Sequence, residues 1–321
     1  MKKLIVHTLL FFVCISGAAQ IENDSTAILL DQQLGGSQDA EAHYNDAVDF
    51  LSTGKPDSAM TYFSKAISLH PQFELARIGR GNLYVDKGKI DQGITDLRIA
   101  LELNHGNYKT HFHLGRAYFL HQKYDESIDA YKECLEIKSD YVYAYNDMAS
   151  AYRQKGDFEN AIINYSLALE IAPTLAYVYN NRGSCYRELK KYEDAIVDYD
   201  RAIDLDSLYA IPYNNKGTCF FSLGDYVKAI LEFDNAIKVD CTYAFAYNNR
   251  GYAMYKLESY SEALKDFNDA IILDSKYGVA YFNRGMCNMQ LMNKDSTCED
   301  WIKASNLGFN AATQHLKSTC E

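Results

Sequence analysis

The sequence predicts an all-α protein built as a linear array of helical pairs. Three observations support this: a 34-residue repeat, small residues at fixed places in each unit, and a turn signal between two helical segments. The repeat is clearest where glycine recurs at Gly183, Gly217, Gly251 and Gly285, each preceded by a base and, before that, an asparagine. A fixed period of this size indicates an array of one small unit rather than a single closed domain.

From residue 40 onward the chain divides into eight units of 34 residues without a gap. The units span residues 40–73, 74–107, 108–141, 142–175, 176–209, 210–243, 244–277 and 278–311. Residues 20–39 before them, which include Gly35-Gly36-Ser37, are expected to form a flexible lead-in. Positions within each unit are numbered 1 to 34.

Each unit contains two helical segments that pack closely. Position 8 is always small: Ala47, Gly81, Gly115, Ala149, Gly183, Gly217, Gly251 and Gly285. Position 27 is small as well, whereas position 24 is large: Phe63, Leu97, Tyr131, Tyr165, Tyr199, Phe233, Phe267 and Trp301. Positions 20, 24 and 27 are spaced by four and three residues, which places them on one face of a helix. Breaks such as Gly156-Asp157 and Gly224-Asp225 end the first helix, so each unit is helix, turn, helix.

The eighth unit departs from the pattern, with Asn288 in place of an aromatic residue and Thr297 in place of alanine. Terminal repeats are expected to differ because one of their faces meets water. Residues 312–321, after Gly308, are predicted to form a capping helix.

This pattern resembles the tetratricopeptide repeat, and the resemblance covers residues 40–311. It implies a right-handed superhelical solenoid of about eight repeats, with the first helices lining a concave groove. The sequence departs from the family near the end of each unit, where only Pro71 and Pro173 occupy the usual proline position. The joins between the other units are therefore expected to be less rigid.

The resemblance places two rows of asparagines in the groove. Position 6 supplies Asn181, Asn215, Asn249 and Asn283, and position 5 supplies Asn146, Asn180, Asn214 and Asn248. An amide both donates and accepts hydrogen bonds, so such a row can pair with an extended peptide backbone. The row is similar to the one in the repeats of O-GlcNAc transferases, although no glycosyltransferase domain follows here. The alternative is that these asparagines serve local hydrogen bonds. The bases at position 7 are expected to pair with acids on neighbouring helices.

Composition narrows the partner class. The net charge is −11, whereas nucleic-acid binding requires a basic surface, so a nucleic-acid partner is not expected. No catalytic constellation, metal-ligand spacing or cofactor motif is present in the sequence. We therefore expect a non-enzymatic module that binds a protein or peptide, with no cofactor and no metal. The alternative is a cell-envelope structural or assembly scaffold that acts through its convex face or by self-association.

The cysteines divide into two groups. Cys185, Cys219 and Cys287 share position 10 in their units and, like Cys134, are expected to be small buried thiols. Cys298 on the second helix of the eighth unit and Cys320 on the capping helix lie at similar distances from the turn near Gly308. They form a possible disulfide in an oxidising compartment. Closing a loop of about 22 residues stabilises the folded state by roughly 3 kcal/mol.

The first residues indicate export. Lys2 and Lys3 precede an apolar run that ends in small residues around Ala19, which is the pattern of a secretory signal peptide over residues 1–19. A membrane anchor and a lipidated Cys14 are the alternatives. We expect the mature protein in the periplasm of a Gram-negative bacterium or secreted, without a membrane span. Its oligomeric state is left open.

Overall fold

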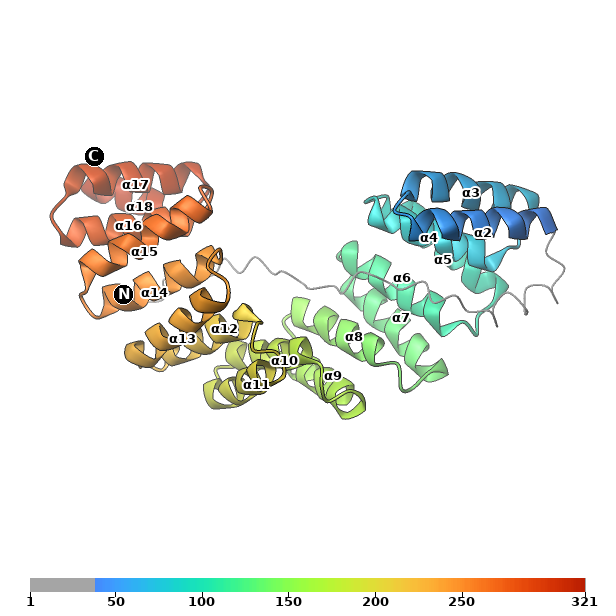
Figure 1. The fold of residues 1–321 in the computed structure, drawn as a ribbon, viewed down its shortest axis with the longest axis horizontal. Coiled ribbons are helices and arrows are strands. Elements are labelled where there is room, and N and C mark those ends of the chain that lie inside the picture. Colours follow the sequence, from blue (N-terminus) through green and yellow to red (C-terminus); the bar gives the residue numbers. More distant parts are fainter. Residues whose placement is uncertain (1–37, 321) are drawn as a thin grey trace. The chain divides into compact units, whose positions relative to one another are not determined.

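The computed structural model describes residues 38–320, and within this range every regular element is an α-helix (Figure 1). The first helices of successive pairs are α2 (Gln38–Ser52), α4 (Glu74–Asp86), α6 (Tyr108–Leu120), α8 (Val142–Gln154), α10 (Ala176–Glu188), α12 (Ala210–Ser222), α14 (Ala244–Lys256) and α16 (Gly278–Gln290). The second helices are α3 (Pro56–Leu69), α5 (Ile90–Leu103), α7 (Tyr124–Ile137), α9 (Phe158–Ile171), α11 (Tyr192–Leu205), α13 (Tyr226–Val239), α15 (Tyr260–Leu273) and α17 (Lys294–Asn306). A last helix, α18 (Asn310–Thr319), follows them. The predicted all-α solenoid of helix pairs is confirmed.

Some of the expected segments fall outside this range. The predicted signal peptide, residues 1–19 with Cys14, and residues 20–37 of the predicted lead-in lie outside the described residues. Gln38 and Asp39, assigned from the sequence to the lead-in, form the start of α2. The last helix begins at Asn310, two residues before the expected start of the capping helix. Within residues 38–320, no helix is long and apolar enough to cross a membrane.

The described residues divide into two compact parts, with the boundary between Ala151 and Tyr152, inside α8. Within each part, a first helix packs against the second helix of its own pair and against the second helix of the preceding pair. In residues 152–320, α10 also contacts α12, α12 contacts α14, and α14 contacts α16, whereas successive second helices make no comparable contacts. A helical array bends toward the layer whose helices lie closer together. The first helices therefore form the inner layer of residues 152–320.

The turn inside each pair has the same backbone geometry in all eight pairs. Position 15 adopts a positive φ throughout, at Gly54, Gly88, Gln122, Gly156, Lys190, Gly224, Glu258 and Met292, with values from 59° to 84°. Glycine reaches this left-handed region without a steric penalty, whereas other L-residues pay about 1–2 kcal/mol. Four pairs adopt the turn without glycine, so tertiary packing and not the turn residue alone determines the geometry.

The predicted pairing of a small position 8 with a large position 24 forms the core. The large side chains Tyr131, Tyr165, Tyr199, Phe233, Phe267 and Trp301 are all at most 1% exposed. A Cβ atom added at Gly217 would lie 2.6 Å from Cε1 of Phe233, which is closer than side-chain carbons approach each other. The ring thus lies directly against the backbone of the first helix, and the two helices of a pair are held at the distance that this contact allows.

The last helix is held at its end by a covalent bond and by apolar packing. A disulfide joins Cys298 on α17 to Cys320, whose Cα atoms lie 5.9 Å apart. Phe309 and Leu316 pack in the same cluster as Phe282 and the fully buried Trp301. The free cysteines Cys134, Cys185, Cys219 and Cys287 are buried, and burial raises the pKa of each thiol to about 12. Cys241, in the turn before α14, is exposed.

We predict that Gly217→Ala destabilises the protein by about 1–3 kcal/mol, because the new methyl group meets the Phe233 ring and the Ala229 carbonyl. Gly106→Ala is the matched control, since its Cβ would meet only the Asn104 side chain at 3.5 Å. Urea unfolding followed by circular dichroism measures both changes. Equal stabilities of the two variants would contradict the packing argument.

Candidate protein-binding face

In the fifth to eighth units, the asparagine, base and glycine occupy consecutive positions of the first helix, about 100° apart around its axis. In the sixth unit these residues are Asn215, Lys216 and Gly217 on α12. Gly217 lies against its own second helix, Lys216 pairs with that helix as well, and Asn215 contacts the preceding first helix. The three residues therefore have three separate roles, of which only that of asparagine involves the inner layer.

The two predicted asparagine rows are joined to each other between successive units. In each link, the Nδ2 atom of a position-6 asparagine donates to the Oδ1 atom of the position-5 asparagine one unit earlier, at 2.9 Å. The linked pairs are Asn215 with Asn180, Asn249 with Asn214, and Asn283 with Asn248. A buried hydrogen bond of this kind contributes roughly 0.5–1.5 kcal/mol to stability. The amides thus hold neighbouring first helices side by side.

Exposure distinguishes two members of the position-6 row from the other asparagines. The position-5 asparagines Asn180, Asn214 and Asn248 are at most 6% exposed. At position 6, Asn181 and Asn249 are half-buried, whereas Asn215 and Asn283 are 6% and 8% exposed. Each amide nitrogen carries two hydrogens, and the link between units uses one of them. Asn181 and Asn249 therefore have the greater access to solvent, whereas Asn215 and Asn283 are about as buried as the position-5 row.

Two arginines that the repeat pattern did not single out lie beside these asparagines. Arg187 donates through Nη1 to Oδ1 of Asn215 at 3.4 Å and through Nη2 to Glu188 at 3.0 Å. Arg153 donates through Nη1 to Oδ1 of Asn181 at 3.5 Å. Both arginines stand at position 12, in the fourth and fifth units only. Their shared position in the repeat is the sequence signal that could have identified them. They make this end of the inner layer polar.

Position 6 carries ionisable groups in the third and fourth units. Asn146, 7% exposed on α8, donates through Nδ2 to Oδ1 of Asp147 at 2.9 Å. Burial raises the pKa of Asp147 to about 6, although this hydrogen bond and the nearby Arg116 act in the opposite direction. Burial lowers the pKa of His113 to about 4, and the positive charges of Arg116 and Lys109 lower it further. Folding therefore shifts the protonation equilibrium of both groups toward the neutral form.

The position-7 bases are ion-paired, as the sequence indicated. Each pairs with the residue at position 23 of its own second helix: Arg80 with Asp96, Arg182 with Asp198, Lys216 with Glu232, Arg250 with Asp266, and Arg284 with Asp300. Several also reach the preceding second helix, as in the contact of Lys216 Nζ with Asp200 at 2.7 Å. These bases join three helices and belong to the architecture of the array.

In the third unit an apolar contact replaces this ion pair. Leu114 replaces the base and Ala130 replaces the acid, and both side chains lie in one buried apolar cluster. The two positions thus change together, because a single charge left on a buried face has no partner. In the fourth unit, Met148 and Asn164 likewise replace the charged residues.

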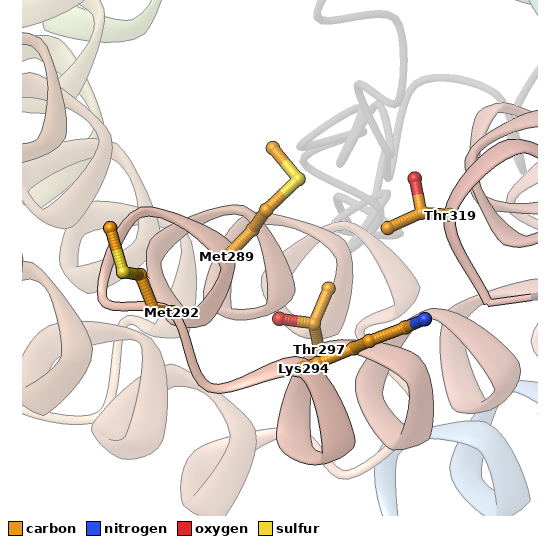
Figure 2. A pocket seen from close by; sticks show the side chains of 5 residues that line it. All are labelled: Met289, Met292, Lys294, Thr297 and Thr319. Carbon is orange, nitrogen blue, oxygen red and sulfur yellow. The ribbon is translucent and has the colours of Figure 1, made fainter.

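Metal ions in proteins are held by grouped His, Cys, Asp or Glu side chains. Among residues 38–320, no three or more His, Cys, Asp or Glu side chains are grouped so as to hold a metal ion. A small pocket near the end of the array is lined by Met289, Met292, Lys294, Thr297 and Thr319 (Figure 2). Its lining combines two thioether side chains, two hydroxyls and one ammonium group, which is not a ligand set for a metal.

Stacked helix pairs with a fixed 34-residue period define a helical-repeat protein whose regular inner layer is suited to recognition. Sequence models described as tetratricopeptide repeat match residues 176–207 and 78–142, and a further one described as TPR repeat matches residues 149–186 and 218–258. The chain belongs to the tetratricopeptide repeat family. Proteins with this fold generally mediate protein–protein interactions and are typically not enzymes.

Solved structures share the fold. A tetratricopeptide repeat protein from Parabacteroides merdae superposes with a TM-score of 0.64 at 20% identity, over 77% of this chain and 99% of that one. The Cut9–Hcn1 complex of APC/C gives 0.61 at 17% identity, over 86% of this chain and 55% of that one. PilF of Pseudomonas aeruginosa gives 0.57 at 17% identity, over 66% and 96%. At these identities, the similarity establishes the fold alone.

Curated relatives match a short stretch. DnaJ homolog subfamily C member 3 of Mus musculus and that of Homo sapiens are each 36% identical to this chain over 63 residues. The match spans 20% of this chain and 12% of the length of those proteins.

We predict that Arg250→Leu alone is strongly destabilising, by about 3–5 kcal/mol, because it leaves the buried carboxylate of Asp266 without its bidentate partner. Adding Asp266→Ala should recover most of that loss, since the double variant copies the Leu114 and Ala130 pair of the third unit. Urea unfolding of both variants measures the recovery. A double variant less stable than the single one would show that the two positions are not coupled.

We predict that Asp147→Asn makes the protein lose stability more steeply on acidification. Because the folded pKa of Asp147 lies above 3.8, its contribution to stability rises as the pH falls from 6 toward 4. His113 has a folded pKa below 6.5, so its contribution falls over the same range and opposes that of Asp147. The variant retains only the His113 effect. Unfolding free energies at pH 4.5 and 7 test this, and parallel profiles of the variant and the wild type would contradict it.

Proposed function

We propose that this protein is a non-enzymatic binding module that holds an extended segment of a partner protein against the inner layer formed by α10, α12, α14 and α16. The observation that carries the proposal is the position-6 amide row, repeated in each of these helices and fixed by hydrogen bonds. An extended backbone offers donors and acceptors at a regular step, which a regular row of amides matches.

The amides need little reorganisation to bind. Asn249 donates to Asn214 and accepts from Asn248 at 3.3 Å, so its side chain is held in one orientation before any ligand arrives. A preformed site loses little conformational entropy on binding, and more of the contact energy therefore appears as affinity. We assign the position-6 row as a whole to ligand contact, with Asn181 and Asn249 as its half-buried members and Asn215 and Asn283 as its more deeply placed ones.

We also propose that the protein is exported and works in the periplasm or outside the cell. The signal-like residues 1–19 support export. The Cys298–Cys320 disulfide supports an oxidising compartment, since disulfides persist there and are rare in reducing cytosol.

A second candidate function is a scaffold that acts through the outer layer. Ile163, Val197 and Leu231 stand at position 22 of three successive second helices and are 55%, 67% and 57% exposed. An aligned row of exposed aliphatic side chains favours association with another protein surface. In this scaffold role the partner would contact these three side chains and would not contact the position-6 amides.

The test is a random peptide library displayed on phage, selected against residues 20–321, with affinities of the selected peptides measured by calorimetry. We predict that Asn215→Ala combined with Asn249→Ala weakens binding about tenfold. The matched control combines Asn180→Ala with Asn214→Ala. It breaks the same two links between units, and hence lowers stability similarly, but retains both position-6 amides.

Thermal unfolding of both double variants establishes that they are folded at the assay temperature. Loss of binding in the position-6 variant alone supports the proposal. Equal affinity of both variants and the wild type contradicts the amide row. If no peptide is enriched, and Val197→Glu with Leu231→Glu abolishes a concentration-dependent oligomer seen by light scattering, the scaffold function replaces it.

A further inference from the structure

A continuous row of aromatic rings begins on the first helices α12 and α14 and extends to the adjoining second helices. Tyr252 follows Asn249 by three residues on α14 and so lies on the same face of that helix. Phe221 and Tyr226 have ring centroids 5.1 Å apart, Phe221 and Tyr252 5.3 Å, Tyr252 and Tyr255 6.0 Å, and Tyr255 and Tyr260 5.4 Å. The five rings come from α12, α13, α14 and α15, and all are half-buried. This set of five residues is termed the aromatic row.

The rings are ordered by contact with one another. Phe221 and Tyr252 are stacked with 27° between their planes, although they belong to successive units. Tyr252 and Tyr255, three residues apart on α14, are stacked with 7° between their planes. Fixed, partly exposed rings provide large contact area at low entropic cost. The row is therefore a preformed apolar surface.

The first helices under this row, α12 and α14, contain no aspartate or glutamate, and neither does α16. Their bases Lys216, Arg250 and Arg284 are paired with acids of the second helices, and Lys256 lies over the Tyr252 ring at 5.6 Å. The acids that border the row in the chain are Asp225, which pairs with Lys228 at 2.8 Å, and Glu258, whose charge is opposite to that of Lys256. The charges around the row therefore balance. Charge complementarity thus favours an uncharged ligand.

The spacing of the rings favours one backbone conformation. A polyproline II helix advances about 3.1 Å per residue and repeats every three residues, or about 9.3 Å per turn. Phe221 and Tyr255 occupy the same position in successive units, and helix layers are spaced by about 8–10 Å. One turn of polyproline II therefore spans one unit of the array and presents equivalent residues to equivalent rings.

Hydrogen-bond donors lie close to the row. Gln290 donates through Nε2 to Tyr255 Oη at 3.4 Å, which leaves the phenolic hydrogen of Tyr255 to donate elsewhere. A polyproline II helix has no internal hydrogen bonds, so its carbonyl groups need such donors. The phenols of the row and the second N–H of the half-buried Asn249 meet this requirement.

The row changes character in the eighth unit. Met289 stands at position 12, where the sixth and seventh units have Phe221 and Tyr255. It lines the small pocket shown in Figure 2 together with Met292 and Thr297. A flexible thioether replaces a flat ring there, so the surface that suits a stiff, regular ligand ends before α16.

We propose that the partner segment is uncharged and proline-rich, and binds as a polyproline II helix along the aromatic row. This inference rests on the proposed function, because it specifies the ligand of the same inner layer. Prolines would pack on the rings, and tyrosine hydroxyls and amide N–H groups would donate to the carbonyls. A ligand that is ordered before binding loses little entropy, which suits a receptor surface that is ordered as well.

The experiment titrates a capped ten-proline peptide into residues 20–321 by calorimetry, with a capped Gly-Ser peptide of equal length as the control ligand. We expect saturable binding of the proline peptide only. Tyr252→Leu should weaken it about tenfold, because leucine keeps apolar volume but removes the flat ring. Tyr247→Leu is the matched control on α14, where the hydroxyl donates to the Cys241 carbonyl at 3.3 Å, away from the row.

The outcomes separate the two proposals. Equal affinities of the Tyr252→Leu and Tyr247→Leu variants overturn the aromatic row as the proline site. If library-selected peptides lacking proline bind in a manner sensitive to the position-6 amides, and the proline peptide does not bind, the polyproline inference is wrong while the proposed function stands. If neither class of peptide binds the folded protein, the proposed function itself fails.

Discussion

The contact between a first-helix backbone and the large side chain at position 24 is the constraint on which the rest of the array depends. Phe233 against Gly217 shows its strength, because a single added methyl group has no space there. This contact fixes the distance and rotation of the two helices. Lys216 then meets Glu232 on the second helix, and Asn215 is directed to the preceding first helix. One packing contact thus assigns a separate role to each of three consecutive residues.

Two kinds of polar contact hold the helices together, and each kind joins different helices. Charged pairs such as Arg250 with Asp266 join first helices to second helices, whereas amide pairs such as Asn249 with Asn214 join first helices to each other. Charges are thereby paired between the layers, and in the first helices α12, α14 and α16 only Lys256 carries a charge outside these pairs. An uncharged layer costs little to desolvate, so a ligand there gains from rings and amides without first displacing tightly held water.

The helix pairs were predictable from the sequence because their signals are local. Small position 8, large position 24 and the break between them all fall within one 34-residue unit. The links between asparagines were not, since Asn215 and Asn180 are 35 residues apart and meet only when units stack. Arg187 was missed for a similar reason, because its partner Asn215 lies in the next unit. Packing within one unit can be predicted from the repeat pattern. Contacts between units can be predicted only when the stacking of the units is known.

The disulfide between Cys298 and Cys320 has a consequence for how the array comes apart. Repeat arrays open from their ends, because a terminal unit has one neighbour and an internal unit has two. The last helix is joined to α17 by a disulfide, whereas α2 and α3 contain no cysteine. Opening of the described helices is thereby favoured at the end near Gln38, and the repeats that carry the aromatic row are among the last to lose their order. Heat or mechanical tension would open this chain in one direction.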